Sequence, residues 1–147
     1  MNLKTTKWAV SAFVLGLIMS VAGVAYANSI SWGNVKDTGT INGYNYYNQA
    51  WIQTVPNLAG ASMGTVNGGN APSGYMGIQA SLYSAGGTLC QDTLPYYYSA
   101  SSTNYIGVGT VGICGAGNYY SKGWSRAYNG NGYTTYPSYL SPDLYLS

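Results

Sequence analysis

Hydrophobic and polar residues alternate along several short stretches of the chain, and residues 74–84 show this most clearly. In "GYMGIQASLYS", one set of alternate positions holds Met76, Ile78, Ala80 and Leu82. The positions between them hold tyrosine, glycine, glutamine and serine. A period of two is typical of a strand with one buried face, so this segment predicts a half-buried strand.

Turn residues separate this strand from its neighbours. Residues 84–87, "SAGG", predict a hairpin turn, and "TLCQDT" after them predicts the return strand. Residues 129–132, "NGNG", lie between two β-prone runs and predict a closing hairpin. Residues 40–55 are β-prone and aromatic, with an Asn-Gly interruption. Turns at this spacing indicate antiparallel strands.

The remaining segments are less regular. Residues 59–68 are expected to add a short strand before a loop at 68–74 that is rich in Gly, Asn and Pro. In "NYIGVGTVGICG", residues 104–115, the apolar positions change parity after Val108, which suggests a bulge in a continuing strand. Pro137 and Pro142 restrict the last segment to an edge or an irregular tail.

These segments together predict an all-β fold. We expect an antiparallel β-sandwich or small barrel of roughly six to eight strands. No helical periodicity, fixed-period repeat or linker occurs after residue 27. Residues 28–147 are therefore predicted to form one domain.

The strand before the closing turn carries an unusual set of side chains. Alternation places five of them on one face: Tyr120, Lys122, Trp124, Arg126 and Tyr128. Only small residues and Tyr119 fall on the other face. Two unpaired cations are costly to bury, so we expect the aromatic and basic face to be exposed and the small residues to face another layer. Tyr97, within "LPYYYSASS", is a second binding candidate, although alternation exposes either Tyr97 or its two neighbours.

The N-terminus predicts a signal peptide. Lys4 and Lys7 precede an apolar run from Trp8 to Val24, and Ala25-Tyr26-Ala27 supplies a small-x-small cleavage pattern. We therefore expect residues 1–27 to be removed after Ala27 and residues 28–147 to be secreted. The alternative is an uncleaved membrane anchor, because the apolar run is long enough to span a bilayer.

Removal of the signal changes the charge. The remaining cations are Lys36, Lys122 and Arg126, and the remaining acids are Asp37, Asp92 and Asp143. The mature chain is therefore neutral, which argues against nucleic acid as a partner. All 17 tyrosines except Tyr26, and most of the 21 glycines, belong to this mature part. Because aliphatic residues are few, we expect aromatic rings to supply much of the buried area.

Cys90 and Cys114 are the only two cysteines, and both follow the signal. An exported chain with an even cysteine count predicts one disulfide between neighbouring or facing strands. The alternative is two buried free thiols. Because histidine is absent and no other cysteine is present, neither a metal site nor a cofactor is expected.

The residue inventory also limits catalysis. The absence of histidine excludes Ser-His-Asp and Cys-His relays. Glutamate is absent, and the three aspartates lie far apart in sequence, so a carboxylate pair would require the fold to assemble it. No glycine-rich segment is followed by the Lys-Ser/Thr of a phosphate loop. We therefore predict a protein that is not an enzyme.

Three functions fit this inventory. The first is a secreted binding module, in which flat rings stack on sugars and cations meet anionic groups of a cell-envelope polymer, a glycan or a protein. The second is a bacteriocin-like antagonist. The third is a self-assembling matrix or fibre protein, because an uncharged Gly/Tyr-rich β chain favours strand-to-strand association. In general character the chain resembles small exported bacterial β proteins. The exposed strand face favours the binding module, with a ring-and-cation ladder that only stiffens the sheet as the alternative role of that face.

Overall fold

The computed structural model describes residues 28–147. The predicted signal peptide, residues 1–27, and its cleavage after Ala27 lie outside the described residues. Within the described range, no helix has the length and apolar character needed to cross a membrane.

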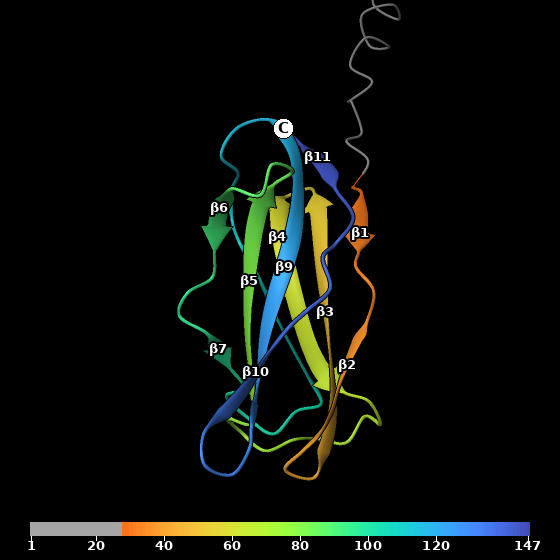
Figure 1. Cartoon of the computed structure of the whole chain (residues 1–147), viewed down its shortest axis with the longest axis vertical. Coiled ribbons are helices and arrows are strands. Elements are labelled where there is room, and N and C mark those ends of the chain that lie inside the picture. Colours follow the sequence, from red (N-terminus) through yellow and green to blue (C-terminus); the bar gives the residue numbers. More distant parts are fainter. Residues whose placement is uncertain (1–27) are drawn as a thin grey trace, which may run out of the picture.

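The chain forms two antiparallel sheets that pack face to face (Figure 1). The first sheet contains β1 (Ile30–Trp32), β2 (Lys36–Ile41), β3 (Tyr44–Thr54), β4 (Asn57–Thr65) and β8 (Tyr105–Gly109). The second sheet contains β5 (Met76–Ser84), β6 (Leu89–Asp92), β7 (Tyr97–Tyr98), β9 (Gly117–Tyr128), β10 (Tyr133–Pro137) and β11 (Leu144–Leu146). The predicted all-β antiparallel fold is confirmed, as a sandwich rather than a closed barrel.

The described residues form eleven strands, more than the six to eight expected, because three of the four sheet edges are built from two short strands in succession. β1 and β2 pair with different parts of β3, β10 and β11 with different parts of β9, and β6 and β7 with different parts of β5. β8 alone forms the fourth edge, on β4.

The predicted turns are present. The hairpin after β5 closes with Ser84 N–H donating to the Thr88 carbonyl at 2.9 Å, and β6 returns antiparallel to β5. Residues 129–132 join β9 to β10. Between β2 and β3, Asn42 and Gly43 have φ values of 47° and 86°. Two successive positive φ values define the tight hairpin turn that Asn-Gly favours.

Three segments differ from their sequence predictions. β5 was predicted to be half-buried but is buried on both faces from Met76 to Leu82, because side chains of neighbouring strands, such as Tyr98 over Gly77, cover its outer face. Residues 57–65 form a full-length central strand, β4, instead of a short one. The strand that was expected to continue through Val111 to Cys114 ends at Gly109, and Val111 is 84 % exposed. The change of apolar parity therefore marks the end of β8 and the start of a loop, not a bulge.

The core lies between the sheets and is more aliphatic than expected. Fully buried side chains include Ile52, Met63, Met76, Ile78 and Leu82. Among the tyrosines of residues 28–147, only Tyr46 and Tyr119 belong to the buried set. The other aromatic rings of the described chain are half-buried or exposed, and several of them cover the outer faces of the two sheets. Aromatic area is thus used mainly outside the core.

Small residues on the inner face of β9 allow the two sheets to approach closely, as the sequence predicts. A Cβ on Gly123 would lie 2.6 Å from the Ala61 Cβ. Nearby, the Ser121 hydroxyl donates to the Gly60 carbonyl at 2.8 Å, and the Asn48 amide donates to the Ser125 hydroxyl at 2.7 Å. Hydrogen bonds between the layers therefore supplement apolar packing.

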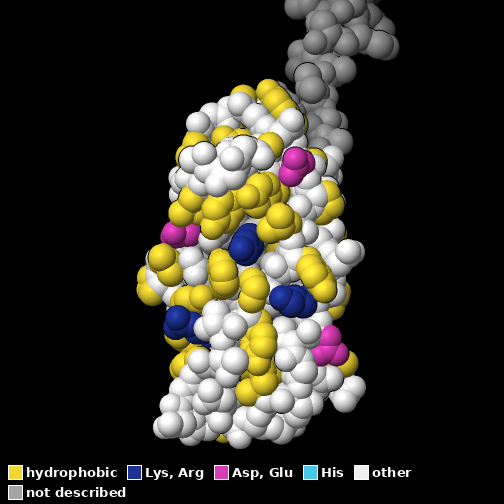
Figure 2. Space-filling view, in the orientation of Figure 1, with side chains coloured by type: hydrophobic (Ala, Val, Ile, Leu, Met, Phe, Trp, Pro, Cys, Tyr) yellow, Lys and Arg dark blue, Asp and Glu magenta, His cyan; other side chains and the backbone are white. Residues whose placement is uncertain are grey.

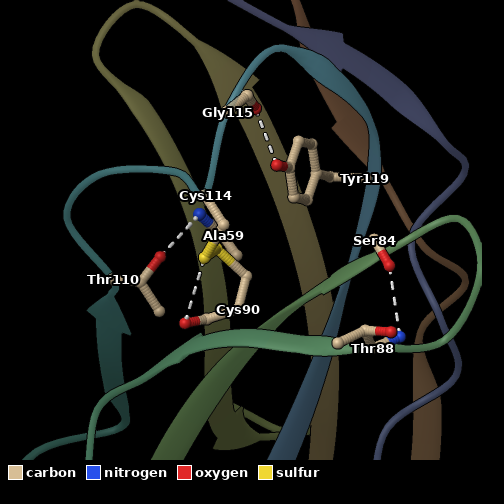
Figure 3. The surroundings of a disulfide bond; sticks show 8 residues. All are labelled: Ala59, Ser84, Thr88, Cys90, Thr110, Cys114, Gly115 and Tyr119. Atoms are coloured by element: carbon tan, nitrogen blue, oxygen red, sulfur yellow. Dashed lines mark hydrogen bonds between the residues drawn. A yellow bond between two sulfur atoms is a disulfide. The ribbon is translucent and has the colours of Figure 1, made fainter.

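The predicted disulfide is confirmed: Cys90 and Cys114 are bonded, with Cα atoms 5.8 Å apart (Figure 3). Cys90 lies on β6, whereas Cys114 lies in the connection from β8 to β9 and not on a strand. Close to it, the Tyr119 hydroxyl donates to the Gly115 carbonyl at 2.7 Å. The bond joins an edge of the second sheet to the chain segment that links the sheets, and it is compatible with an extracellular protein.

Candidate functional site

The outer face of β9 carries the five residues that alternation placed together. Tyr120, Lys122, Trp124, Arg126 and Tyr128 are half-buried, while the alternate positions from Tyr119 to Ala127 are buried. The segment alternates because one side of the second sheet faces the core and the other faces solvent. The predicted exposure is therefore partial, and the reason is that the side chains of this face cover one another.

Lys122 and Trp124 form the centre of the face. The Lys122 ammonium lies 4.5 Å from the centre of the Trp124 ring. On the adjacent β5, Ser81 pairs with Lys122 and Gln79 pairs with Trp124. Ser81 and Gln79 are themselves buried, with exposed fractions of 2 % and 8 %, so larger side chains of the outer face cover them. The attraction between a cation and a ring face holds the Lys122 side chain along the strand.

Arg126 is held by two tyrosines that sequence reasoning did not assign to this face. Its guanidinium carbon lies 3.8 Å from the centre of the Tyr96 ring, and its Nη1 donates to the Tyr98 hydroxyl at 3.0 Å. The hydrogen bond to Tyr98 raises the pKa of Arg126 above its ordinary value. Gly77 is opposite Arg126 on β5, and a Cβ there would lie 2.6 Å from the Tyr98 ring. The glycine thus makes room for the ring.

Tyr120 stacks on another ring at one end of the face. Its partner is Tyr83, directly opposite on β5, with ring centres 5.4 Å apart and ring planes at 10°. Alternation along residues 74–84 placed Tyr83 among the polar positions of the strand that is now β5. The sequence did not predict that β5 pairs with β9. The stack is therefore a part of the site that only the fold shows.

Tyr128 belongs to a tyrosine cluster at the other end of the face. Its ring centre lies 5.0 Å from that of Tyr75 and 5.8 Å from that of Tyr133, and the Tyr133 hydroxyl donates to the Gly74 carbonyl at 2.8 Å. These three rings, with Ser73 and Gly74, line an open pocket of about 320 Å³. The pocket offers flat aromatic walls beside backbone and hydroxyl groups.

Tyr97 does not join these residues. It pairs with Ile78, a core position, whereas Tyr98 pairs with Gly77 below the Arg126 side chain. Tyr97 is 48 % exposed and lines a different pocket. The structure therefore separates the two binding candidates: the neighbours of Tyr97 contribute to the β9 face, and Tyr97 lies apart from it.

The cations of the described chain contact rings and polar groups. Lys36 lies 5.5 Å from the centre of the Tyr139 ring and donates to the Pro137 carbonyl at 2.8 Å. Figure 2 shows the Lys and Arg side chains among hydrophobic side chains on this face, with the acidic side chains nearer its margins. The face therefore combines positive charge with aromatic surface. Within residues 28–147, no group of three or more His, Cys, Asp or Glu side chains is arranged to hold a metal ion.

Comparison of the chain with protein-family models, with curated proteins and with solved structures gave no match. The function of the chain is therefore inferred from the chemistry of the β9 face.

Proposed function

We propose that this is a secreted, non-catalytic binding module that attaches to a cell-envelope polymer or glycan through the outer face of β9. The observation that carries the proposal is the arrangement of Lys122 over the Trp124 ring, between the Tyr83–Tyr120 stack and the Tyr128 cluster. Flat aromatic rings bind the apolar faces of sugars, and cations between them bind carboxylate or phosphate groups. A polymer with both features would contact the whole row.

The strand also has properties that suit a binding surface. Its side chains are supported by β5 on one side and β10 on the other, so the rings lose little freedom when a ligand binds. Tyrosine and tryptophan provide large contact areas with few rotatable bonds. The antagonistic and fibre-forming roles stay predictions; neither explains why the cations are placed among the rings.

A pull-down on purified cell walls and on insoluble glycans tests the proposal. We expect Trp124→Ala and Tyr128→Ala each to weaken binding by about tenfold, which corresponds to one lost ring contact of about 1.4 kcal/mol. Trp32→Ala is the matched control, because Trp32 is 49 % exposed on the first sheet, away from β9. Unchanged binding by a folded protein that carries both Trp124→Ala and Tyr128→Ala would refute the proposal.

The charge of the ligand can be tested separately. The Lys122 ammonium lies over the Trp124 ring on the outer face. Lys122→Gln removes this charge but keeps a long polar side chain at the position, so the fold should be unaffected. We expect weaker binding to anionic walls and unchanged binding to neutral polysaccharides, and we expect added salt to weaken only the anionic interaction. If Lys122→Gln leaves binding to both polymers unchanged, the cation has no role in recognition.

A further inference from the structure

β8 is the only sheet edge of the described chain that is formed by one uninterrupted strand. One side of β8 pairs with β4, from Gly60↔Gly109 to Gly64↔Tyr105, and its opposite side is the sheet edge. Just outside the strand, the Thr65 N–H donates to the Asn104 carbonyl and the Thr110 N–H donates to the Ala59 carbonyl. Backbone groups alternate in direction along a strand, so Ile106 and Val108 also point toward β4. The backbone groups of residues 105, 107 and 109 therefore point to the open edge.

One of these three residues is already capped. The Thr103 hydroxyl accepts the Tyr105 N–H at 3.3 Å and donates to the Tyr105 carbonyl at 3.1 Å. Gly107 and Gly109 have no such cap, and both are exposed. Beside Gly107 the surface is hollowed into a pocket of about 290 Å³ that Tyr97, Thr103 and Tyr105 also line. An extended backbone could reach the edge from there.

The β8 edge also lacks the features that usually prevent pairing between molecules. Its sequence, Tyr-Ile-Gly-Val-Gly, contains no charge and no proline. In contrast, β2 carries Lys36 and Asp37, β6 carries Asp92, and β10 ends with Pro137. Charges, prolines and interruptions are the means by which proteins protect edge strands. Among the sheet edges formed by residues 28–147, only β8 is both uncharged and continuous.

We infer that β8 is a self-association surface, on which β8 of a second copy pairs antiparallel about Gly107. This register is self-complementary: Tyr105 lies opposite Gly109 of the other copy, and Ile106 lies opposite Val108. The chain already uses the ring-over-glycine arrangement between neighbouring strands, since Tyr47 covers Gly64 and Tyr98 covers Gly77. Opposed β-branched residues also stabilise strand pairs.

Charge supports a second copy as the occupant. The described residues contain three cations and three acids, so two copies have no net repulsion. The contact would join two first sheets through their edges and leave the outer face of β9 on the second sheets free. The inference is therefore independent of the proposed binding function, and each can fail without the other.

Analytical ultracentrifugation over a wide concentration range tests the surface. A Cβ on Gly107 would meet its nearest neighbours, the Ala61 carbonyl and the Tyr105 hydroxyl, at 3.5 Å, so Gly107→Lys is compatible with the fold. In the paired register it would place two ammonium groups opposite each other. We expect dimerisation of the native chain and at least about tenfold weaker dimerisation of the variant.

Gly86→Lys is the matched control, because Gly86 lies in the hairpin turn with only the Ser84 hydroxyl within 4 Å of an added Cβ. This control should dimerise like the native chain. Thr103→Val should have the opposite effect, because it frees the Tyr105 backbone to pair, and we expect about tenfold tighter association. A native chain that stays monomeric at millimolar concentration, or a dimer that Gly107→Lys does not weaken, would overturn the inference.

Discussion

Tyr46 carries a buried hydroxyl that has no hydrogen-bond partner among residues 28–147. Tyr119 is the other buried tyrosine, and its hydroxyl donates to the Gly115 carbonyl. Removing an unpartnered buried hydroxyl relieves a desolvation cost, whereas removing a bonded one loses a hydrogen bond. We therefore expect Tyr46→Phe to keep or raise the free energy of unfolding, by up to about 1 kcal/mol, and Tyr119→Phe to lower it by about 1 kcal/mol. Urea denaturation of both variants measures the difference; equal losses would contradict it.

The same residue predicts a dependence of stability on alkaline pH. Burial, aided by the nearby Tyr44 and Tyr75 phenols, raises the pKa of Tyr46 from 10.0 to about 12. Below pH 10 the phenol is protonated in both the folded and unfolded states. Above it, the unfolded state loses the proton first, so the free energy of unfolding falls as pH rises toward 12, by up to about 3 kcal/mol. Burial also raises the pKa of Tyr133, which adds an effect of the same sign.

Tyr46→Phe separates the contribution of Tyr46 to this effect. Between about pH 9 and about pH 11, the free energy of unfolding should fall less in the variant than in the native chain, because phenylalanine has no phenol to ionise. Urea midpoints at the two pH values give the comparison, with Tyr119→Phe as the control. If the urea midpoint falls equally between the two pH values in all three proteins, Tyr46 ionises as readily in the folded state as in the unfolded state.

At the scale of elements, rings of one strand cover glycines of the next. A Cβ at Gly60 on β4 would overlap the Trp51 ring on β3, and a Cβ at Gly64 would lie 2.7 Å from the Tyr47 hydroxyl. We expect Gly60→Ala to lower the free energy of unfolding by about 1–3 kcal/mol, because the ring must move. Gly69→Ala is the control, with nothing within 4 Å of the added Cβ. Chemical denaturation should separate the two variants, and equal stability would contradict the prediction.

The sequence predicts elements well where alternation is strong. β9 alternates along most of its length, and its buried and outer faces were predicted from local residues alone. The turn after β5 was also predicted, but the strand itself is buried on both faces from Met76 to Leu82 and is not half-buried. β4 was underestimated because "NLAGASMGT" has few β-branched or aromatic residues and is buried on both faces. Its outer face is covered by the Trp51 and Tyr47 rings from β3, which is information that a single segment cannot contain.

The same limit applies to the candidate site. Alternation on β9 was sufficient to bring Lys122, Trp124 and Arg126 onto one face. It could not show that Tyr96 and Tyr98 reach Arg126, or that Tyr83 stacks on Tyr120, because these contacts depend on which strands become neighbours. The sequence feature that points to this pairing is the small size of Gly77 and Ser81 on β5, which leaves space beside Arg126 and Lys122 on β9.

At the scale of the whole molecule, the disulfide connects the edge strand β6 to the loop that carries the chain from the first sheet to the second. The bond spans a sequence separation of 24 residues. Closing a loop of this length restricts the unfolded chain and stabilises the fold by roughly 3–4 kcal/mol. The Cys90→Ala/Cys114→Ala double variant should therefore unfold at a lower urea concentration by a corresponding amount.

Loss of the disulfide should leave the β9 face intact while the protein stays folded. β6, which carries Cys90, pairs with the end of β5 from Ser81 to Tyr83. Trp124 and Arg126 pair with Gln79 and Gly77 farther along β5. Because β9 is held by β5 on one side and by β10 on the other, its central side chains do not depend on the crosslink. We expect the double variant to bind cell walls as the native chain does at temperatures where both are folded, and to lose binding at a lower temperature. Loss of binding by a fully folded double variant would instead show that the disulfide positions the face directly.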